Sequence, residues 1–217
     1  MNGDSSTCRL YLVRNPMPEQ LWLPGLEAPP TPTDGLFCAV FPDANTAASI
    51  SKLAQQLCGE SRARSKPLAA ARLHVTLQHL GNFAGGLPQA RVEAAMKAAS
   101  LVRMEPFSVE FDTVVSFASK PRPGPLVLGG GEGVNGLHRL HDALCRALQD
   151  AGCGEHAMSA AVDYTPHVTL AYGMPWAAAR PVEPLCWNVR EFALMHSLLG
   201  RTRHVMLARW PLADARP

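Results

Sequence analysis

Two short stretches of the sequence repeat the same residues, His74-Val75-Thr76-Leu77 and His167-Val168-Thr169-Leu170. In an extended strand, the side chains of residues i and i+2 point to the same face, about 6.5 Å apart. Each copy therefore presents one imidazole and one hydroxyl together, while the valine and the leucine face a core. If the two strands lie side by side, two histidines and two threonines share one cleft.

This set of side chains suits a tetrahedral phosphate. One neutral imidazole can take a proton from a nucleophile, and the other, as an imidazolium, can give a proton to the leaving oxygen. The hydroxyls of Thr76 and Thr169 can donate hydrogen bonds to the oxygens on which negative charge builds. The repeat therefore predicts acid–base chemistry at phosphorus.

Two other interpretations compete with this one. A single His-x-Thr on a strand is more often a half-buried histidine beside a β-favouring threonine, and only the duplication favours catalysis. A metal site is also conceivable, because several further side chains could join the two motif histidines as ligands: His79, His138, His141 and Asp163. His79 lies an odd number of positions from the first motif histidine, so its side chain should point to the opposite face of the strand. His138 and His141 stand at i, i+3 on a predicted helix, where a surface position is expected.

Composition places the chain among ordinary globular proteins. With 20 Lys+Arg against 18 Asp+Glu, the formal net charge of +2 is too small to indicate nucleic-acid binding by itself. No run of about 18 apolar residues predicts a membrane span, and no secretory signal opens the sequence, so we expect a cytoplasmic protein. The 6 cysteines contain no Cys-x-x-Cys pair, so neither a zinc site nor a disulfide framework is expected.

The elements that must position the motifs follow from the hydrophobic pattern. Residues 1–34 are predicted to be a Pro-rich leader, and residues 35–217 a single bilobal domain. Apolar residues at helical spacing predict helices over 44–57, 88–102 and 134–151. Apolar and β-branched runs predict strands over 36–41, 72–80, 107–117, 125–128 and 167–172, and a final hairpin of 189–198 with 204–210. Strands that interleave with helices in this way indicate an α+β fold.

In these residues the sequence resembles the two-histidine (2H) phosphoesterase superfamily, and within it the bacterial RNA 2',3'-cyclic phosphodiesterases, also called the 2'-5' RNA ligase family. The likeness runs in order through residues 36–212: an opening Leu-Phe-x-Ala-Val-Phe-Pro strand, both His-x-Thr-Leu motifs, a Pro-Leu-Val-Leu-Gly strand between them and a closing Trp-Pro-Leu. The resemblance implies a bilobal α+β fold, with two pseudo-symmetric antiparallel sheet lobes, helices outside and a central cleft.

The resemblance also implies a chemistry. It is the hydrolysis of RNA 2',3'-cyclic phosphate ends to 2'-phosphates without a metal ion or cofactor, with 2'-5' ligation as a side activity. By the same analogy, His74 is the general acid at the departing 3' oxygen and His167 the base that activates water, while Thr76 and Thr169 hold the phosphate. The residues themselves leave open which histidine does which.

The chain departs from its relatives in its basic residues. Members of the family usually carry a basic residue just after the first motif, where this chain has Gln78, and an arginine that closes the second, where it has Tyr172. Arg72 would then neutralise the phosphate, because it lies two positions before His74 and should face the same side of the predicted strand. Arg201 and Arg203 could take this role instead. A plain solvated-loop role for these arginines is equally open.

Three functions therefore follow as hypotheses. The first is a phosphodiesterase for RNA with 2',3'-cyclic phosphate ends. The second is an esterase for cyclic nucleotides or ADP-ribose cyclic phosphates, and the third is a protein that binds RNA ends without turnover. Under each we expect a monomer that needs no membrane.

Overall fold

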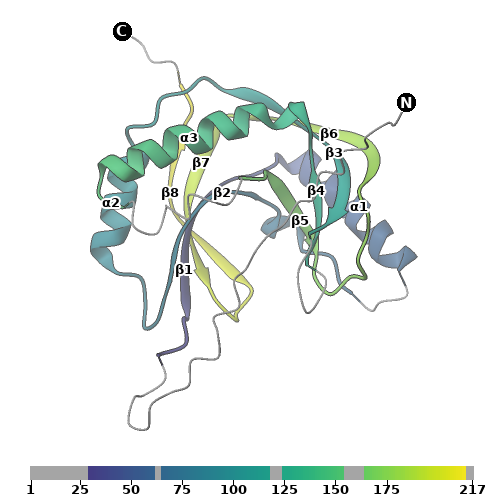
Figure 1. Ribbon diagram of the computed structural model, residues 1–217, viewed down its shortest axis with the longest axis horizontal. Helices are drawn as coiled ribbons and strands as arrows, with labels where there is room; N and C mark the ends of the chain where they lie inside the picture. The colour runs from purple at the N-terminus through teal and green to yellow at the C-terminus, as the bar shows by residue number, and fades with distance from the viewer. Residues whose placement is uncertain (1–28, 62–64, 118–123, 154–163, 214–217) are drawn as a thin grey trace, which may run out of the picture.

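The computed structural model describes residues 29–61, 65–117, 124–153 and 164–213. The strands are β1 (Asp34–Val40), β2 (Val75–Phe83), β3 (Phe107–Ser116), β4 (Leu126–Gly129), β5 (His167–Ala171), β6 (Arg180–Val189), β7 (Glu191–Leu198) and β8 (Arg203–Pro211), and the helices are α1 (Ala44–Glu60), α2 (Gln89–Ala99) and α3 (Asn135–Asp150). The strands form an 8-stranded sheet in the order β6-β3-β4-β5-β2-β1-β7-β8 (Figure 1). No helix in these ranges is both long and apolar enough to cross a membrane.

The sheet consists of two lobes that meet at one register pair. The first lobe contains β2, β1, β7 and β8, and the second contains β5, β4, β3 and β6. The inner strands of the lobes, β2 and β5, are antiparallel and pair through Val75 and Val168. Each His-x-Thr motif thus lies at the junction, and the predicted bilobal α+β fold is confirmed.

Helix α1 begins with a side-chain cap. The carboxylate of Asp43 accepts a hydrogen bond from the backbone N–H of Thr46 at 2.9 Å, which satisfies a donor that the first turn would leave unpaired. Its apolar stripe, Ile50, Ala54 and Leu57, is buried, and the helix packs against β5 and β6 of the second lobe. The helix predicted over residues 44–57 is confirmed and extends to residue 60.

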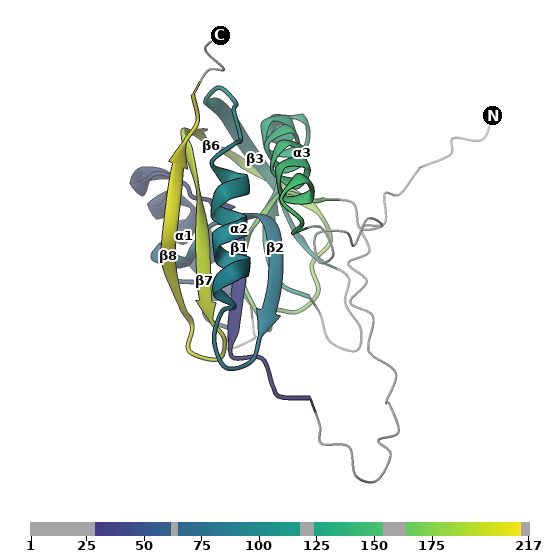
Figure 2. The same ribbon diagram turned by 90° about the vertical axis from the view of Figure 1, so that its left-hand side faces the viewer.

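Helix α3 carries the most regular apolar stripe. The leucines Leu137, Leu140, Leu144 and Leu148 are fully buried at i, i+3, i+4 spacing, and the helix packs against α2, β2 and β3, so it spans both lobes. Gly136 allows this close approach, because a Cβ there would collide with a ring of β3. Figure 2 shows α2 running along the strand direction of the first lobe.

Two strands differ from the sequence prediction. β6 was not predicted, because Pro181 and Pro184 interrupt its pattern. It is an edge strand of the sheet, where proline is tolerated since one side of the backbone needs no partner. The first motif strand was predicted to start at residue 72, but Ala70–Arg72 forms a short 3-10 turn and β2 starts at Val75. The expectation that Arg72 and His74 lie on the same face of one strand is therefore wrong.

Two bulges bend β2 against β1. Between Thr76 and Gln78, and again between His79 and Gly81, β2 advances two residues while β1 advances one. Each extra residue turns the following side chains to the opposite face of the sheet. On β2 the residues that face the cleft are therefore not strictly alternate.

The chain enters the fold at Thr33. Its backbone N–H donates to the carbonyl of Phe83 at 2.8 Å, and its carbonyl accepts from the N–H of Leu199 at 2.8 Å. β1 thus begins one residue before the predicted domain start at Gly35. Most of the predicted Pro-rich leader, residues 1–28, lies outside the described residues.

Candidate active site

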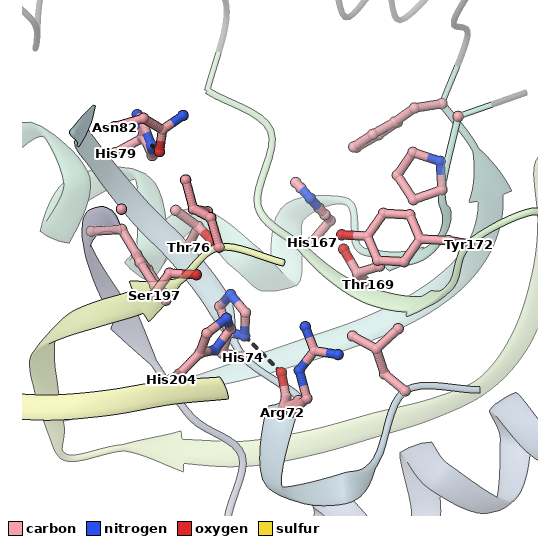
Figure 3. A pocket seen from close by; sticks show the side chains of 17 residues that line it. Arg72, His74, Thr76, His79, Asn82, His167, Thr169, Tyr172, Ser197 and His204 are labelled. Carbon is pink, nitrogen blue, oxygen red and sulfur yellow. Dashed lines mark hydrogen bonds between the residues drawn. The ribbon is translucent and has the colours of Figure 1, made fainter. Parts of the chain in front are cut away.

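A cleft of about 540 Å³ lies over the junction of the two lobes (Figure 3). Both His-x-Thr pairs line it: His74, Thr76, His167 and Thr169. The structure thus brings the four predicted catalytic side chains into one cavity, with two from each lobe.

The register of β2 and β5 sets the arrangement of the motif side chains. Val75 and Val168 pair with each other and are fully buried, so the residues on either side of each valine face the cleft. Continuing the antiparallel register by one residue places each histidine across from the threonine of the other motif. The two histidines therefore occupy one diagonal, for which such positions are roughly 7–8 Å apart.

Both motif histidines are held by the same kind of hydrogen bond. Nδ1 of His74 lies 2.7 Å from the carbonyl oxygen of Arg72, and Nδ1 of His167 lies 2.8 Å from that of Thr165. Because a carbonyl oxygen only accepts, Nδ1 is the donor in each ring. In the neutral ring Nε2 then carries the lone pair, so each motif fixes the tautomer as well as the position of its histidine.

Burial disfavours the charged form of both imidazoles. It lowers the pKa of His74 to about 4, with further lowering by positive charge at His204, His167 and Arg72. Burial also lowers the pKa of His167, against the opposing effect of its bond to the Thr165 carbonyl. An anion placed between the rings would favour protonation of one of them.

An aromatic ring packs against each of these histidines. Phe117 lies edge-on to His167, with ring centroids 4.6 Å apart and an interplanar angle of 79°. Phe37 contacts His74 with centroids 5.2 Å apart. Both phenylalanines line the cleft, so they exclude water from one side of each imidazole and restrict its rotation.

Arg72 places a guanidinium in the cleft. It comes from the short turn that precedes β2 and, in the view of Figure 3, points toward the space between the two motif histidines. Its Nε is buried and has no hydrogen-bond partner among the described residues. An unpaired buried donor costs about 1–3 kcal/mol, and an anionic ligand would remove this cost.

The other predicted substrate-binding residues divide into two groups. Tyr172 lines the cleft and keeps 60% of its surface exposed. Gln78 does not line it, because the first bulge of β2 turns its side chain toward α3, where its Oε1 accepts from Cys145 Sγ at 3.4 Å. Arg201 and Arg203 are exposed at the turn between β7 and β8, and neither belongs to the cleft lining.

The alternative metal ligands that the structure describes lie at two places, His79 in the cleft and the other two histidines on α3. Among the described residues, no three His, Cys, Asp or Glu side chains are placed to hold a metal ion. His79 does line the cleft, contrary to the prediction, because the first bulge of β2 turns its side chain toward the cleft. His138 and His141 lie on α3 and pack against the ring of Tyr164, with centroids 5.4 and 4.1 Å apart. Asp163 lies outside the described residues.

His204 is a cleft residue that was not predicted from the sequence. This residue lies on β8, pairs with Ser197 of β7 and lines the cleft. Its ring is edge-on to that of His74, with centroids 5.4 Å apart and an angle of 79°. No motif marks it, and only the pairing of the final hairpin beside β1 could have indicated that it reaches the site.

Comparison with known proteins agrees with this fold. The family model for the 2'-5' RNA ligase superfamily matches residues 41–201. The crystal structure of TT0787 from Thermus thermophilus is 25% identical, covers 84% of this chain and 100% of its own, and has a TM-score of 0.67. That of E. coli LigT complexed with 3'-AMP is 24% identical, covers 85% of this chain and 100% of its own, and has a TM-score of 0.66.

A further solved structure, described as a phosphoesterase, is 24% identical, covers 83% of this chain and 99% of its own, and has a TM-score of 0.63. No curated protein sequence matches the chain. The matched family region contains both His-x-Thr strands and most of the cleft lining. The chain therefore belongs to the 2'-5' RNA ligase superfamily of 2H phosphoesterases.

Proposed function

We propose that this protein hydrolyses the 2',3'-cyclic phosphate at RNA ends to a 2'-phosphate without a metal ion. The observation that carries the proposal is the pair of diagonal imidazoles, each held through Nδ1 and each across from a threonine. Crystal structures of E. coli LigT with 3'-AMP, with ATP, with NADP+ and with phosphate support a nucleotide or phosphate ligand in this fold.

The arrangement suits displacement at phosphorus. One imidazole takes a proton from water through Nε2 while the water oxygen bonds to phosphorus. The bond from phosphorus to O3' breaks, and the other imidazole donates its Nε2 proton to O3'. The product is a 2'-phosphate beside a free 3'-hydroxyl. A 5'-hydroxyl of a second RNA in place of water would give a 2'-5' bond by the same steps.

The charge that builds on the non-bridging oxygens needs donors. Thr76 and Thr169 supply hydroxyls from the two lobes, and Arg72 supplies a fixed positive charge. Arg72 thereby takes the role that the missing basic residues at Gln78 and Tyr172 leave open. Its buried Nε, which has no hydrogen-bond partner in the described part of the chain, supports this assignment.

One observation favours a second candidate function. Because Arg201 and Arg203 do not line the cleft, nothing in the described part of its lining requires a long RNA. An esterase for cyclic nucleotides or ADP-ribose cyclic phosphates would use the same chemistry. Under the first proposal, the two arginines contact the RNA backbone beyond the reacting end. A monomer in the cytoplasm stays a prediction under both.

Product analysis on an oligonucleotide that ends in a 2',3'-cyclic phosphate tests the proposal. The expected product is the 2'-phosphate, and His74→Ala and His167→Ala should each lower turnover by about 100- to 10,000-fold. His138→Ala is the matched control, since His138 lies on α3 outside the cleft. Hydrolysis of a cyclic mononucleotide alone would support the second candidate. Binding of the RNA end without any product would overturn both.

A further inference from the structure

The two motif strands meet through little backbone pairing. Among the described residues, β2 and β5 share the single register pair of Val75 with Val168. Helix α3 packs against β2 of the first lobe and against β3 of the second, and Figure 1 shows it running across the sheet. Side chains of α3 that contact the segments around the two motifs can therefore influence how the motifs are held.

A series of side-chain contacts on α3 links these two segments. The ring of Tyr164, which precedes β5, stacks on the imidazole of His141, with centroids 4.1 Å apart and an interplanar angle of 6°. Nε2 of His141 lies 3.4 Å from Sγ of Cys145, and this thiol donates to Oε1 of Gln78 on β2 at 3.4 Å. Nδ1 of His141 donates to the carboxylate of Asp142 at 3.1 Å. The imidazole under Tyr164 is therefore held at both of its nitrogens.

Tyr164 is next in sequence to the residue whose carbonyl holds His167. The Thr165 carbonyl accepts from Nδ1 of His167 at 2.8 Å. On its C-terminal side this carbonyl is bonded to Pro166, which is buried and whose ring fixes one backbone torsion angle. On its N-terminal side stands Tyr164 with its stacked ring. The peptide that orients the imidazole therefore lies between a proline and an anchored aromatic side chain.

The first motif holds its carbonyl in a different way. Arg72, whose carbonyl holds His74, belongs to a 3-10 turn that the N–H of Leu73 closes by donating to the carbonyl of Ala70 at 3.1 Å. In the second motif the residue before the histidine is Pro166, which has no N–H and cannot close such a turn. A proline also disfavours helical backbone at the residue before it. The second motif therefore needs another means of fixing its carbonyl.

We propose that Tyr164, stacked on His141, is a positioning residue that fixes the Thr165 carbonyl and thereby the position and tautomer of His167. Its consequence for the rate rests on the proposed function, whereas its effect on the His167 ring does not. The proposal holds whichever of the two motif histidines is the base.

The ring of Tyr164 carries this role, and its hydroxyl does not. The hydroxyl oxygen is buried and has no hydrogen-bond partner among the described residues. Burial also raises the pKa of Tyr164, so the hydroxyl stays neutral. Tyr164→Phe keeps the stacked ring and should therefore behave like the unaltered protein. Tyr164→Leu removes the stack and should release the carbonyl.

Nitrogen NMR of the histidine rings tests the positioning directly and without a substrate. When His167 is neutral, its proton lies on Nδ1 in the unaltered protein, because the Thr165 carbonyl only accepts. In Tyr164→Leu the tautomer protonated at Nε2 should appear, whereas Tyr164→Phe should keep the proton on Nδ1. His74, which the 3-10 turn holds, should keep its tautomer in both variants and serves as the internal control.

Two variants control for the loss of packing alone. Trp210 is a half-buried aromatic residue that stacks on Phe192 with centroids 5.4 Å apart, and it does not belong to the described cleft lining. Trp210→Leu therefore removes a stacked ring far from the second motif. His138→Ala is the second control, because His138 contacts the ring of Tyr164 only edge-on and the stack on His141 remains. Both controls should keep the Nδ1 tautomer of His167.

Initial rates on a 2',3'-cyclic mononucleotide give a second readout. Because a catalytic group misplaced by about 1 Å can slow a reaction about 100-fold, Tyr164→Leu should lower kcat by roughly 10- to 100-fold. KM should change less, since the threonines and Arg72 still line the cleft. His141→Leu removes the other half of the stack and should give a similar loss. The double variant should lose no more than Tyr164→Leu alone, because the two rings act as one unit.

These measurements can overturn the proposal in three ways. A folded Tyr164→Leu variant whose His167 keeps its proton on Nδ1 would do so, as would an equal loss of kcat in Trp210→Leu or losses that add in the double variant. If Tyr164→Leu does not fold, His141→Leu decides by the same tautomer and rate measurements. If the unaltered protein hydrolyses no cyclic phosphate, the proposed function fails, and the tautomer of His167 still decides whether Tyr164 positions it.

Discussion

Replacement of Thr76 or Thr169 by valine isolates the contribution of a single hydroxyl to catalysis. Valine keeps the β-branched shape and the strand preference of threonine and removes only the donor. Both threonines are partly buried in the cleft lining, and each stands across from the histidine of the other motif. The substitution should therefore leave the fold and the histidines in place.

The size of the effect follows from the type of bond. A hydrogen bond to a charged group contributes about 1.5–3 kcal/mol, and about 1.4 kcal/mol corresponds to a tenfold change in rate. Each valine variant should therefore lower kcat by roughly 10- to 150-fold. KM should change less, because the charge on the phosphate oxygens grows toward the transition state.

Initial rates on a 2',3'-cyclic mononucleotide measure this effect, and thermal unfolding checks the fold. Serine at either position keeps the hydroxyl and should retain most of the activity. Thr113→Val is the matched control, because Thr113 lies on β3 outside the cleft and its hydroxyl donates to Asp112 at 2.9 Å. A folded valine variant with a rate within about twofold of the unaltered protein would refute the role of the hydroxyls.

The turn arginines, Asp34 and metal removal give three further predictions. Arg201→Ala/Arg203→Ala should raise KM for an oligonucleotide and flatten the salt dependence of its binding, but barely alter hydrolysis of a cyclic mononucleotide; equal losses of kcat on both substrates would place one arginine at the phosphate. Hydrogen bonds from Thr33 and His196 lower the pKa of Asp34, so Asp34→Asn should lower urea stability near neutral pH. That difference should vanish as the pH falls through the lowered pKa, and a difference that persists in acid would contradict it. EDTA should leave initial rates unchanged, whereas a loss that zinc restores would indicate a metal enzyme.

The helices and the motif strands could be predicted from the sequence because their patterns are local. The leucine stripe of α3 needs only helical spacing, and the Asp43 cap of α1 needs only its neighbours. The junction of the motifs could be predicted because both copies of His-x-Thr alternate in the same way and carry buried valines.

Features that depend on tertiary pairing could not be predicted. The bulges of β2, which exchange Gln78 for His79 in the cleft, are visible only in its register with β1. The proline-containing strand β6 forms because it lies at a sheet edge, and a sequence does not show which strand is at the edge. His204 reaches the site because β8 pairs with β7, a relation between strands that the residue itself does not reveal.

The first lobe joins segments from distant parts of the chain, as the hydrogen bond between Asp34 and His196, 162 positions apart, shows. The strands of the second lobe, β3 to β6, follow one another in the sequence. Closing long loops is entropically unfavourable and slows folding, so during synthesis the second lobe is free to pair before the first. A nascent chain that has not yet produced β7 and β8 already carries both His-x-Thr motifs but only part of the cleft wall. The wall of the cleft is therefore complete only once β7 and β8 have been synthesised and have paired with β1.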